Sequence, residues 1–154
     1  MIALCSDQAA YTLKHAVMQY LDARGEAYVD LGNYDMEVTY FSYFVDKTCR
    51  FMLTGKAKRA IIFCGSGIGI GLAANKYPGI RCGRCDDPTQ VALGRQQTDM
   101  NVLAIGARIT GSTLAIEMVE TFLDTPFDPA YQASLDSLRA ADQRYFKEAY
   151  IGLI

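Results

Sequence analysis

The glycine-rich segment from Cys64 to Gly69, Cys-Gly-Ser-Gly-Ile-Gly, holds the residue types of this sequence that are best suited to chemistry. The apolar run at 60–63 before it predicts a buried parallel strand, and 72–76 after it predicts a helix. Cys64 is therefore expected at the carboxyl end of a strand, the edge where open α/β sheets bind their ligands. Glycines let backbone N–H groups approach a ligand, and a helix N-terminus favours both an anion and a thiolate. Cys64 is thus a candidate base or nucleophile.

The turn alone leaves a simpler alternative open. It does not fit the dinucleotide fingerprint Gly-x-Gly-x-x-Gly cleanly, and the phosphate-binding sequence Gly-x-x-x-x-Gly-Lys-Ser is absent. A buried cysteine at a strand end, followed by glycines that serve only packing, would give the same pattern. The rest of the chain has to decide between these interpretations.

Two further groups of residues could carry chemistry, and for both a structural role is the stronger prediction. Cys82 and Cys85 have the Cys-x-x-Cys spacing of a redox dithiol or of half a zinc site, but no second Cys/His pair completes a zinc site. His15, the only histidine, lies in the middle of a predicted helix beside Lys14. We expect it at the surface rather than among ligands.

Length and composition are those of one globular domain. The 154 residues are long enough for one core, and 51% of them are hydrophobic. A net charge of −2 gives no electrostatic reason to expect nucleic acid as a partner. No apolar run approaches the ~20 residues of a membrane span, and Met1 leads directly into an apolar strand rather than a basic signal peptide. The cysteines are odd in number, 5, and several lie in apolar strands, so we expect reduced thiols and a cytoplasmic protein.

Apolar strands alternate with amphipathic helices along the chain. Strands are predicted at 2–5, 28–31, 59–64, 79–84 and 102–106, and helices at 9–24, 40–53 and 72–76, from 87, at 111–123 and at 128–150. The Asp-Pro pairs at 87–88 and 128–129 supply an N-cap and a first helical residue. This order predicts one α/β domain over 1–154, a Rossmann-like three-layer sandwich with a five-stranded, mostly parallel sheet and a C-terminal helix. The last helix, within 128–154, carries apolar residues that need a surface, either the chain's own sheet or a partner subunit.

Six motifs follow one another at the predicted strand ends and turns. They are Ser-Asp-Gln-Ala-Ala at 6–10, Asp-Leu-Gly-Asn-Tyr at 30–34, the turn at 64–69, Ala-Ala-Asn-Lys-Tyr-Pro-Gly-Ile-Arg at 73–81, Asn-Val-Leu-Ala-Ile-Gly-Ala-Arg-Ile-Thr-Gly at 101–111 and Asp-Thr-Pro-Phe at 124–127. In this order and spacing the chain resembles, over residues 1–127, the family of B-type ribose-5-phosphate isomerases and galactose-6-phosphate isomerase subunits. Because several long motifs agree, the resemblance favours a catalytic Cys64 over a cysteine that only packs.

The resemblance implies aldose–ketose isomerisation of a phosphorylated sugar, without metal or organic cofactor. It also implies a homodimer or tetramer whose active site lies between subunits. The cysteine matching Cys64 would move a proton between C1 and C2, supported by the hydroxyl residue matching Ser66. Asp7 would contact sugar hydroxyls, and Arg108 would hold the phosphate. An anion hole for the enediolate would come from the amides of Gly65, Gly67, Ile68 and Gly69.

The chain departs from the family at three places. Gln8 stands where the family has histidine after Ser-Asp, Gln97-Thr98 stands where it has the His-Asn pair that opens the sugar ring, and no matching arginines follow Phe127. We still predict substrate contacts at four positions, Gln8, Tyr40, Gln97 and Thr98. A glutamine can form hydrogen bonds there, but it cannot shuttle a proton near neutral pH as histidine does. Three interpretations follow: an open-chain substrate such as a tetrose phosphate, a second family subunit that supplies the missing residues, or a non-catalytic paralogue that binds a sugar phosphate.

The missing late arginines also bear on phosphate binding. We expect Arg108 to carry more of that binding, with help from Arg84 or Arg95, because arginine pairs with phosphate through charge-assisted and often bidentate hydrogen bonds. Arg139 and Arg144 in the last predicted helix are expected to contribute little.

Overall fold

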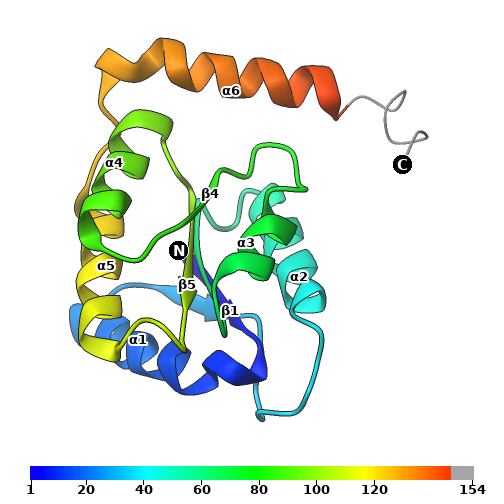
Figure 1. Cartoon of the computed structure of the whole chain (residues 1–154), viewed down its shortest axis with the longest axis vertical. Helices are drawn as coiled ribbons and strands as arrows, with labels where there is room; N and C mark the ends of the chain where they lie inside the picture. The colour runs from blue at the N-terminus through cyan, green and yellow to red at the C-terminus, as the bar shows by residue number, and fades with distance from the viewer. Residues whose placement is uncertain (147–154) are drawn as a thin grey trace.

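A single parallel β-sheet forms the centre of the molecule (Figure 1). The computed structural model describes residues 1–146, and its strands run in the order β2-β1-β3-β5-β4, with every neighbouring pair parallel. The strands are β1 (Ile2–Ser6), β2 (Tyr28–Asp30), β3 (Arg59–Cys64), β4 (Cys82–Arg84) and β5 (Val102–Gly106). All carboxyl ends therefore lie at one edge, where β1, β3 and β5, the strands that precede most of the predicted site residues, are neighbours.

Helices cover both faces of the sheet and complete three layers (Figure 1). They are α1 (Tyr11–Arg24), α2 (Phe41–Leu53), α3 (Ile68–Ala74), α4 (Pro88–Thr98), α5 (Ser112–Asp124) and α6 (Gln132–Tyr145), with short 3₁₀ turns at Gln8–Ala10 and Pro129–Tyr131. One face packs against α1, α4 and α5, and the other against α2 and α3. The predicted α/β sandwich is confirmed. Within residues 1–146 none of these helices combines the length and apolarity that a membrane crossing requires.

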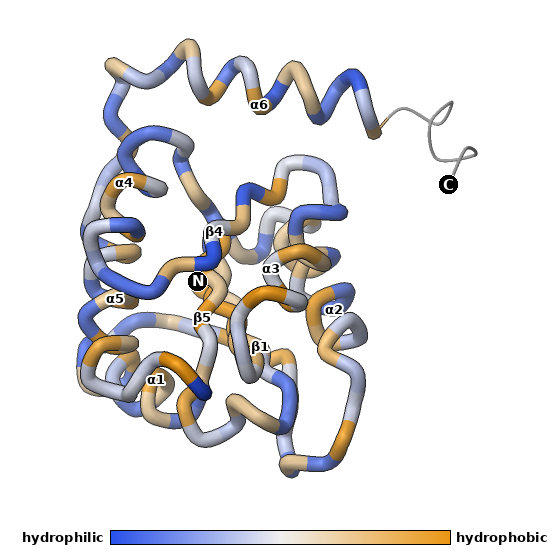
Figure 2. The backbone as a smooth tube through the Cα atoms, viewed as in Figure 1, coloured by the Kyte–Doolittle hydropathy of each residue, from blue (hydrophilic) through white to orange (hydrophobic). Residues whose placement is uncertain are grey.

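The central strands bury both of their faces, which explains why their sequences are apolar runs rather than alternations. Along β1, Ile2 and Leu4 pack in the core shared with α1, α4 and α5, whereas Ala3 and Cys5 pack in the core shared with α2 and α3. Figure 2 shows hydrophobic residues concentrated along the strands and hydrophilic residues along the outer turns. Burial of each large side chain stabilises the sheet by roughly 1.5–3 kcal/mol, and this fixes the strand ends that carry the candidate site.

Two predicted boundaries are wrong, and each has a local cause. The helix predicted at 72–76 is α3, which starts earlier and ends where Asn75 exchanges two hydrogen bonds with the Cys82 backbone, at 2.8 and 2.9 Å. The strand predicted at 79–84 is shortened to β4, because the chain turns at Gly79 with a left-handed φ of +76°. Asp87 caps α4 as predicted, and its carboxylate accepts the Gln90 N–H at 2.9 Å.

The C-terminal helix α6 packs against α4 and leaves much of its own surface uncovered. The helix predicted at 128–150 starts with the second 3₁₀ turn and continues as α6, and its residues 147–150 lie outside the described residues. Leu135 is buried, whereas Tyr131 and Leu138 are 39% and 40% exposed. The predicted contact of this helix with a partner subunit stays a prediction, and packing on the chain's own sheet is not what the structure shows.

The part of α1 that carries Lys14 and His15 is more buried than the sequence predicts. Lys14 is fully buried, and its ammonium donates to both carboxylate oxygens of Asp30 and to the Asn33 carbonyl, each at 2.7 Å. His15 is half-buried against the ring of Tyr11, and its Nδ1 lies 3.0 Å from the Tyr11 carbonyl oxygen. Lys14 therefore ties α1 to the end of β2, a structural role that turns an expected surface cation into a core residue.

Candidate active site

Cys64 ends β3 and is held there by the turn that follows. Its side chain is 5% exposed, and the Gly67 N–H donates to its Sγ at 3.1 Å. Gly67 has a φ of +75°, and a Cβ on it would lie 3.0 Å from the Gly106 backbone nitrogen. A Cβ on Gly106, in turn, would lie 2.6 Å from the Ser66 carbonyl group. The two glycines thus let the turn fold back against β5 and aim an amide at the thiol.

A pocket of about 420 Å³ opens over this turn at the carboxyl edge of the sheet. It brings the predicted catalytic residues Cys64, Ser66 and Asp7 together in one chain. Phe41 and Ile109 also line it, and sequence reasoning missed them because an apolar side chain carries no chemical signal. The full lining is Asp7, Gln8, Ala9, Phe41, Cys64, Gly65, Ser66, Gly69, Arg108 and Ile109.

Arg108 follows β5 and lies directly against the turn. A Cβ on Gly65 would sit 3.2 Å from the Arg108 Nε and 3.3 Å from its Cζ, so the glycine makes room for the guanidinium. Within residues 1–146 no carboxylate forms an ion pair with Arg108. An arginine placed in this way on a pocket wall is suited to bind a phosphate.

Asp7 follows β1 and faces the same pocket. Burial raises the pKa of its carboxyl above the ordinary value, while backbone N–H groups of Ala9, Ala10 and Gly65 and the charge of Arg108 oppose that shift. The Ala10 N–H donates to Oδ1 at 3.2 Å, so Asp7 also caps the 3₁₀ turn before α1. The carboxyl group is thus fixed at a position where it can accept hydrogen bonds from substrate hydroxyls.

Ser66 and Gln8 present polar atoms near the thiol. The Ser66 Oγ accepts the Ile68 N–H at 3.2 Å, which leaves the hydroxyl proton free to donate. The Gln8 Oε1 is buried and has no hydrogen-bond partner in the described part of the chain, so a donor from a bound molecule would satisfy it. The amides of Gly67 and Ile68 donate hydrogen bonds within the turn, to the Cys64 Sγ and the Ser66 Oγ.

Five predicted substrate contacts are not among the residues that line this pocket: Gly67 and Ile68 of the turn itself, and Tyr40, Gln97 and Thr98. Tyr40, at the start of α2, is 86% exposed and lines a neighbouring cavity of about 270 Å³ that also includes Asp7 and Gln8. Gln97 and Thr98 end α4, and Thr98 lines a separate cavity of about 480 Å³ beside α6. Neither Gln97 nor Thr98 lines the Cys64 pocket. One chain does not bring them to Cys64, and their role as contacts from a neighbouring subunit stays a prediction.

The two arginines expected to help Arg108 have other partners. Arg95 is 3% exposed and bonds the Asp99 carboxylate and two backbone carbonyls, so the prediction that it helps to hold phosphate is wrong. The Arg84 Nε donates to the Ser66 carbonyl at 3.2 Å, and Arg84 does not line the pocket. Arg108 is therefore the arginine that lines the Cys64 pocket in the part of the chain that the structure describes.

The other cysteines are packing residues. Cys82 and Cys85 are free thiols, and burial raises the pKa of both, that of Cys85 to about 11. Within residues 1–146 no group of three or more His, Cys, Asp and Glu side chains is arranged to hold a metal ion. The Cys-x-x-Cys spacing thus reflects the short, half-buried strand β4, with Cys82 as its first residue and the buried Cys85 directly after its last.

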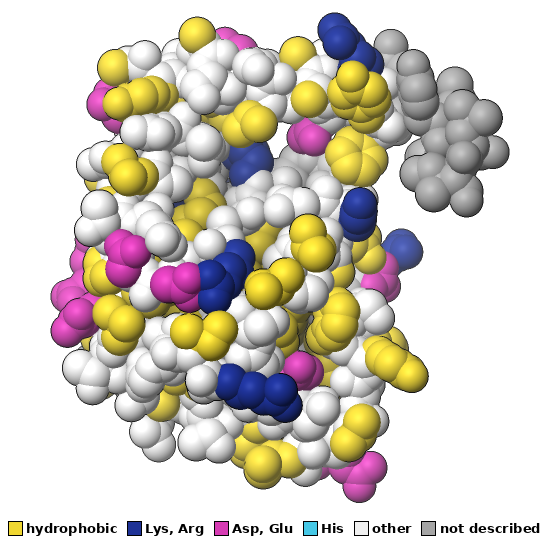
Figure 3. Space-filling model, in the orientation of Figure 1, with side chains coloured by type: hydrophobic (Ala, Val, Ile, Leu, Met, Phe, Trp, Pro, Cys, Tyr) yellow, Lys and Arg dark blue, Asp and Glu magenta, His cyan; other side chains and the backbone are white. Residues whose placement is uncertain are grey.

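The pocket opens beside an exposed apolar surface. Figure 3 shows apolar side chains gathered over α2 and α3 on this face. Ile68 and Leu72 of α3 are 53% and 63% exposed, and Ile109 on the pocket wall is 58% exposed. The side chain of Ile68, whose amide was predicted for the anion hole, therefore belongs to this outer surface. Exposed apolar patches of this kind mark interaction surfaces.

Comparison with known proteins assigns the family. Residues 2–138 match the model of the family described as Ribose/Galactose Isomerase. This chain belongs to that family. Ribose-5-phosphate isomerase B of Escherichia coli K12 is 33% identical to it over 144 residues, which are 93% of this chain and 97% of the relative. The D-erythrulose-4-phosphate isomerase of Pectobacterium atrosepticum is 34% identical over 129 residues, which are 82% of this chain and 84% of the relative.

The fold agrees with this assignment. The solved structure of Clostridium thermocellum ribose-5-phosphate isomerase B has a TM-score of 0.90 and 32% identity to this chain, and the match covers 94% of this chain and 98% of the other. The predicted family and the predicted class of enzyme, an isomerase of the ribose/galactose isomerase family, are confirmed.

Proposed function

We propose that this chain is an aldose–ketose isomerase of a short, open-chain phosphorylated sugar, with Cys64 as the base. The observation that carries the proposal is the shared pocket of Cys64, whose Sγ accepts the Gly67 N–H at 3.1 Å, and Arg108, a cation without a carboxylate partner among residues 1–146. A sugar phosphate carries two features that these side chains suit. Its C–H group next to the carbonyl is acidic and can lose its proton to Cys64, and its phosphate is a dianion that can pair with Arg108.

The reaction moves one proton between neighbouring carbons. The Cys64 thiolate takes the proton from the carbon next to the carbonyl, the C–H electrons form the C1=C2 double bond, and negative charge moves to the carbonyl oxygen. Amides of the turn and the Ser66 hydroxyl stabilise this enediolate. The hydroxyl proton of the neighbouring carbon's oxygen then moves to the former carbonyl oxygen, the thiol returns its proton to the former carbonyl carbon, and the new carbonyl forms at the neighbouring carbon. Asp7 orients the sugar hydroxyls and Arg108 holds the phosphate.

No histidine among residues 1–146 lines the pocket, so it lacks the side chain that opens the sugar ring in the family pattern. Ring opening needs a proton at the ring oxygen and removal of the anomeric proton, and glutamine does neither near pH 7. Gln97 stands where the family pattern has the ring-opening histidine, Gln8 stands where it has the histidine after Ser-Asp, and His15 does not line the pocket. A tetrose phosphate cannot close a ring through its phosphorylated oxygen and reaches the enzyme open. The relative named for D-erythrulose 4-phosphate supports such a substrate.

The position of Gln97 and Thr98 outside the pocket favours one second candidate. In a mixed assembly, another family member would supply a histidine and arginines to the Cys64 pocket. The chain would then be one subunit of a sugar-phosphate isomerase. A sugar-phosphate-binding protein without activity is the remaining alternative, and the retained Cys64, Ser66 and glycine turn speak against it.

The test is a substrate panel with the purified chain alone. We expect kcat/KM for erythrulose 4-phosphate to exceed that for ribose 5-phosphate by roughly 10²–10⁴-fold, the scale of one general acid–base group. Efficient turnover of ribose 5-phosphate would contradict the substrate proposal. Binding of these phosphates without turnover of any would contradict catalysis by the single chain, and activity restored by a second family member would establish the mixed assembly.

A further inference from the structure

The peptide group between Ser66 and Gly67 is held on both sides. Its N–H donates to the Cys64 Sγ at 3.1 Å, and its carbonyl oxygen accepts from the Arg84 Nε at 3.2 Å. Because a peptide group is planar and trans, its N–H and C=O point in opposite directions. Arg84 therefore lies behind the turn, on the side of the peptide away from the thiol, and it is not among the residues that line the pocket.

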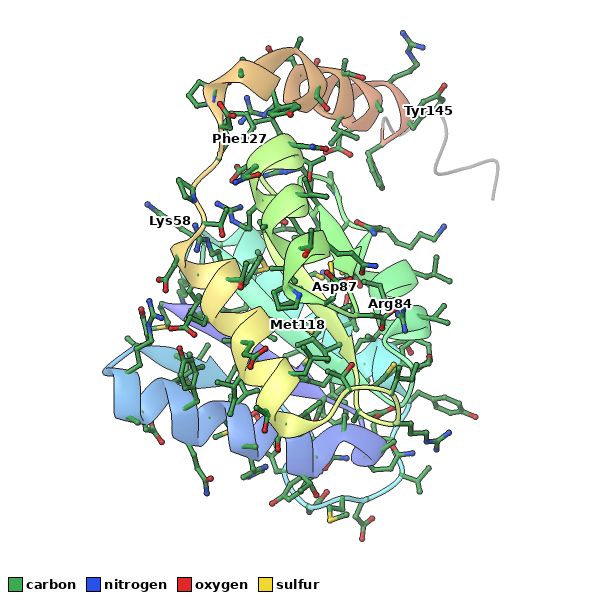
Figure 4. The ribbon with its side chains drawn as sticks, turned by 60° about the vertical axis from the view of Figure 1, so that its left-hand side comes forward. Lys58, Arg84, Asp87, Met118, Phe127 and Tyr145 are labelled. Atoms are coloured by element: carbon green, nitrogen blue, oxygen red, sulfur yellow. The ribbon has the colours of Figure 1, made fainter. Side chains whose placement is uncertain are left out.

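Two further contacts fix Arg84 in this place. Its Cγ lies 3.2 Å from the position that a Cβ would take on Gly67, so the stem of the side chain packs against the turn. Its guanidinium also forms an ion pair with the carboxylate of Asp86. The backbone N–H of Asp86 donates to the Gln90 Oε1 at 2.9 Å. Figure 4 shows Arg84 near α3, with Asp87 at the start of α4 beyond it. The guanidinium is thus shared between a carboxylate and the Ser66 carbonyl.

Other titratable groups act on Cys64 from different directions. Asp7 and Arg108 face it across the pocket, from the residues that follow β1 and β5. The thiols of Cys5 and Cys49 lie in the same core layer, and burial raises the pKa of each to about 12, so both stay neutral near pH 7. Arg84 differs from all of these because it reaches Cys64 through a hydrogen-bonded peptide.

We infer that Arg84 is a positioning residue for the base: it orients and polarises the Ser66–Gly67 peptide, and Asp86 limits how much of its charge acts there. The inference rests on the proposed role of Cys64. A cation at a carbonyl withdraws electrons from the peptide and strengthens its N–H as a donor, as in other chains of hydrogen bonds. A stronger donor favours the thiolate over the thiol, because a charged acceptor gains more from the bond.

The test measures the chemical reactivity of the Cys64 thiol instead of the turnover of a substrate. The rate at which iodoacetamide modifies Cys64 is measured across the neutral and alkaline pH range, by mass spectrometry of the peptide that carries it. Arg84→Met keeps the stem and removes the guanidinium, and we expect the midpoint of this profile to rise by about one pH unit. Arg84→Lys should restore part of the shift. Arg139→Met, at a side chain 55% exposed on α6, is the matched control and should leave the midpoint unchanged.

Asp86→Asn separates polarisation from packing. Loss of this carboxylate leaves the full charge of Arg84 on the Ser66 carbonyl, so the midpoint should fall, opposite to Arg84→Met. A purely structural role would move both variants in the same direction, because each would loosen the turn. Unchanged midpoints, or shifts of the same sign, would overturn the inference. If Arg84→Met does not fold, a midpoint that fails to fall in Asp86→Asn overturns it alone.

The measurement needs no substrate. Absence of isomerase activity in the wild-type chain would therefore contradict the proposed function and leave the Arg84 result to be judged separately. Where the chain is active, kcat for erythrulose 4-phosphate in Arg84→Met should fall with little change in KM, since Arg84 touches the base through the turn and not the substrate.

Discussion

Cys64 combines a buried side chain with a sulfur atom that faces a pocket. Burial removes water that would compete for the Gly67 N–H, so the hydrogen bond from this amide to Sγ is stronger here than it would be in solvent. The position of Cys64 at a strand end can be predicted from the sequence, while the hydrogen bond itself depends on Gly67 and Gly106, which only the folded chain brings together.

Arg108 should dominate phosphate binding. Arg108→Met removes the guanidinium beside Gly65, and we expect KM for a sugar phosphate to rise roughly 10- to 100-fold with a smaller change in kcat, because a hydrogen bond to a charged group contributes about 1.5–3 kcal/mol. Steady-state kinetics measure both constants. Arg139→Met and Arg144→Met on α6 are the matched controls. Equal small effects in all three variants would show that the phosphate is held elsewhere.

The ionised carboxylate of Asp7 should lower the stability of the folded chain at neutral pH, although the proposed reaction uses it to orient the sugar hydroxyls. Burial raises the pKa of its carboxyl, so the folded chain holds this proton to higher pH than the unfolded chain, and stability from Asp7 falls as pH rises through that window. Asp7→Asn keeps the cap and cannot ionise. We expect the Tm of the variant minus the Tm of the wild type to increase as the pH is raised from about 4 to about 7. The kcat/KM of the variant should be lower than that of the wild type. A Tm difference that is constant or reversed over this range would contradict the assignment.

At the scale of elements, the buried ion pair of Lys14 holds α1 to the end of β2. Lys14→Met should lower the free energy of unfolding by about 3 kcal/mol, because it leaves the Asp30 carboxylate, 20% exposed, without its cation. Chemical denaturation measures this loss. The control is Arg50→Met, which removes an ion pair to Asp46 from a side chain 73% exposed and should cost less than about 1 kcal/mol. Equal effects in the two variants would refute the anchoring role.

The strands and most helices were predictable because their signals are local. β1, β3 and β5 bury both faces and read as apolar runs, and the Asp87-Pro88 pair marks the start of α4. The errors come from contacts between residues distant in sequence. Asn75 ends α3 by bonding the Cys82 backbone, and no pattern within either segment announces that pairing.

The same distinction holds for the candidate site. Cys64, Ser66, Asp7 and Arg108 stand in motifs at strand ends, so the sequence predicts them and the parallel sheet brings them together. Arg84 lies 18 residues from Ser66, and its contact with the turn follows from the neighbouring positions of β4 and β5. Such a contact needs the folded chain.

At the scale of the whole molecule, the exposed apolar surface beside the pocket predicts self-association. We expect the wild-type chain to elute with at least twice its own mass in size-exclusion chromatography with light scattering, and Leu72→Glu, at 63% exposure on α3, to shift it to the mass of one chain. Leu53→Glu, 53% exposed at the end of α2, is the control. A monomeric wild type, or an unchanged mass for Leu72→Glu, would contradict this prediction.

The central claim is that Cys64 moves a carbon-bound proton of a sugar phosphate. Its most direct test is NMR detection of deuterium incorporated from D₂O at C1 or C2 of erythrulose 4-phosphate, with wild type and with Cys64→Ala. The account predicts rapid incorporation by the wild-type chain and a loss of roughly 10²–10⁴-fold in the folded variant. Incorporation at a near-normal rate by Cys64→Ala would contradict it.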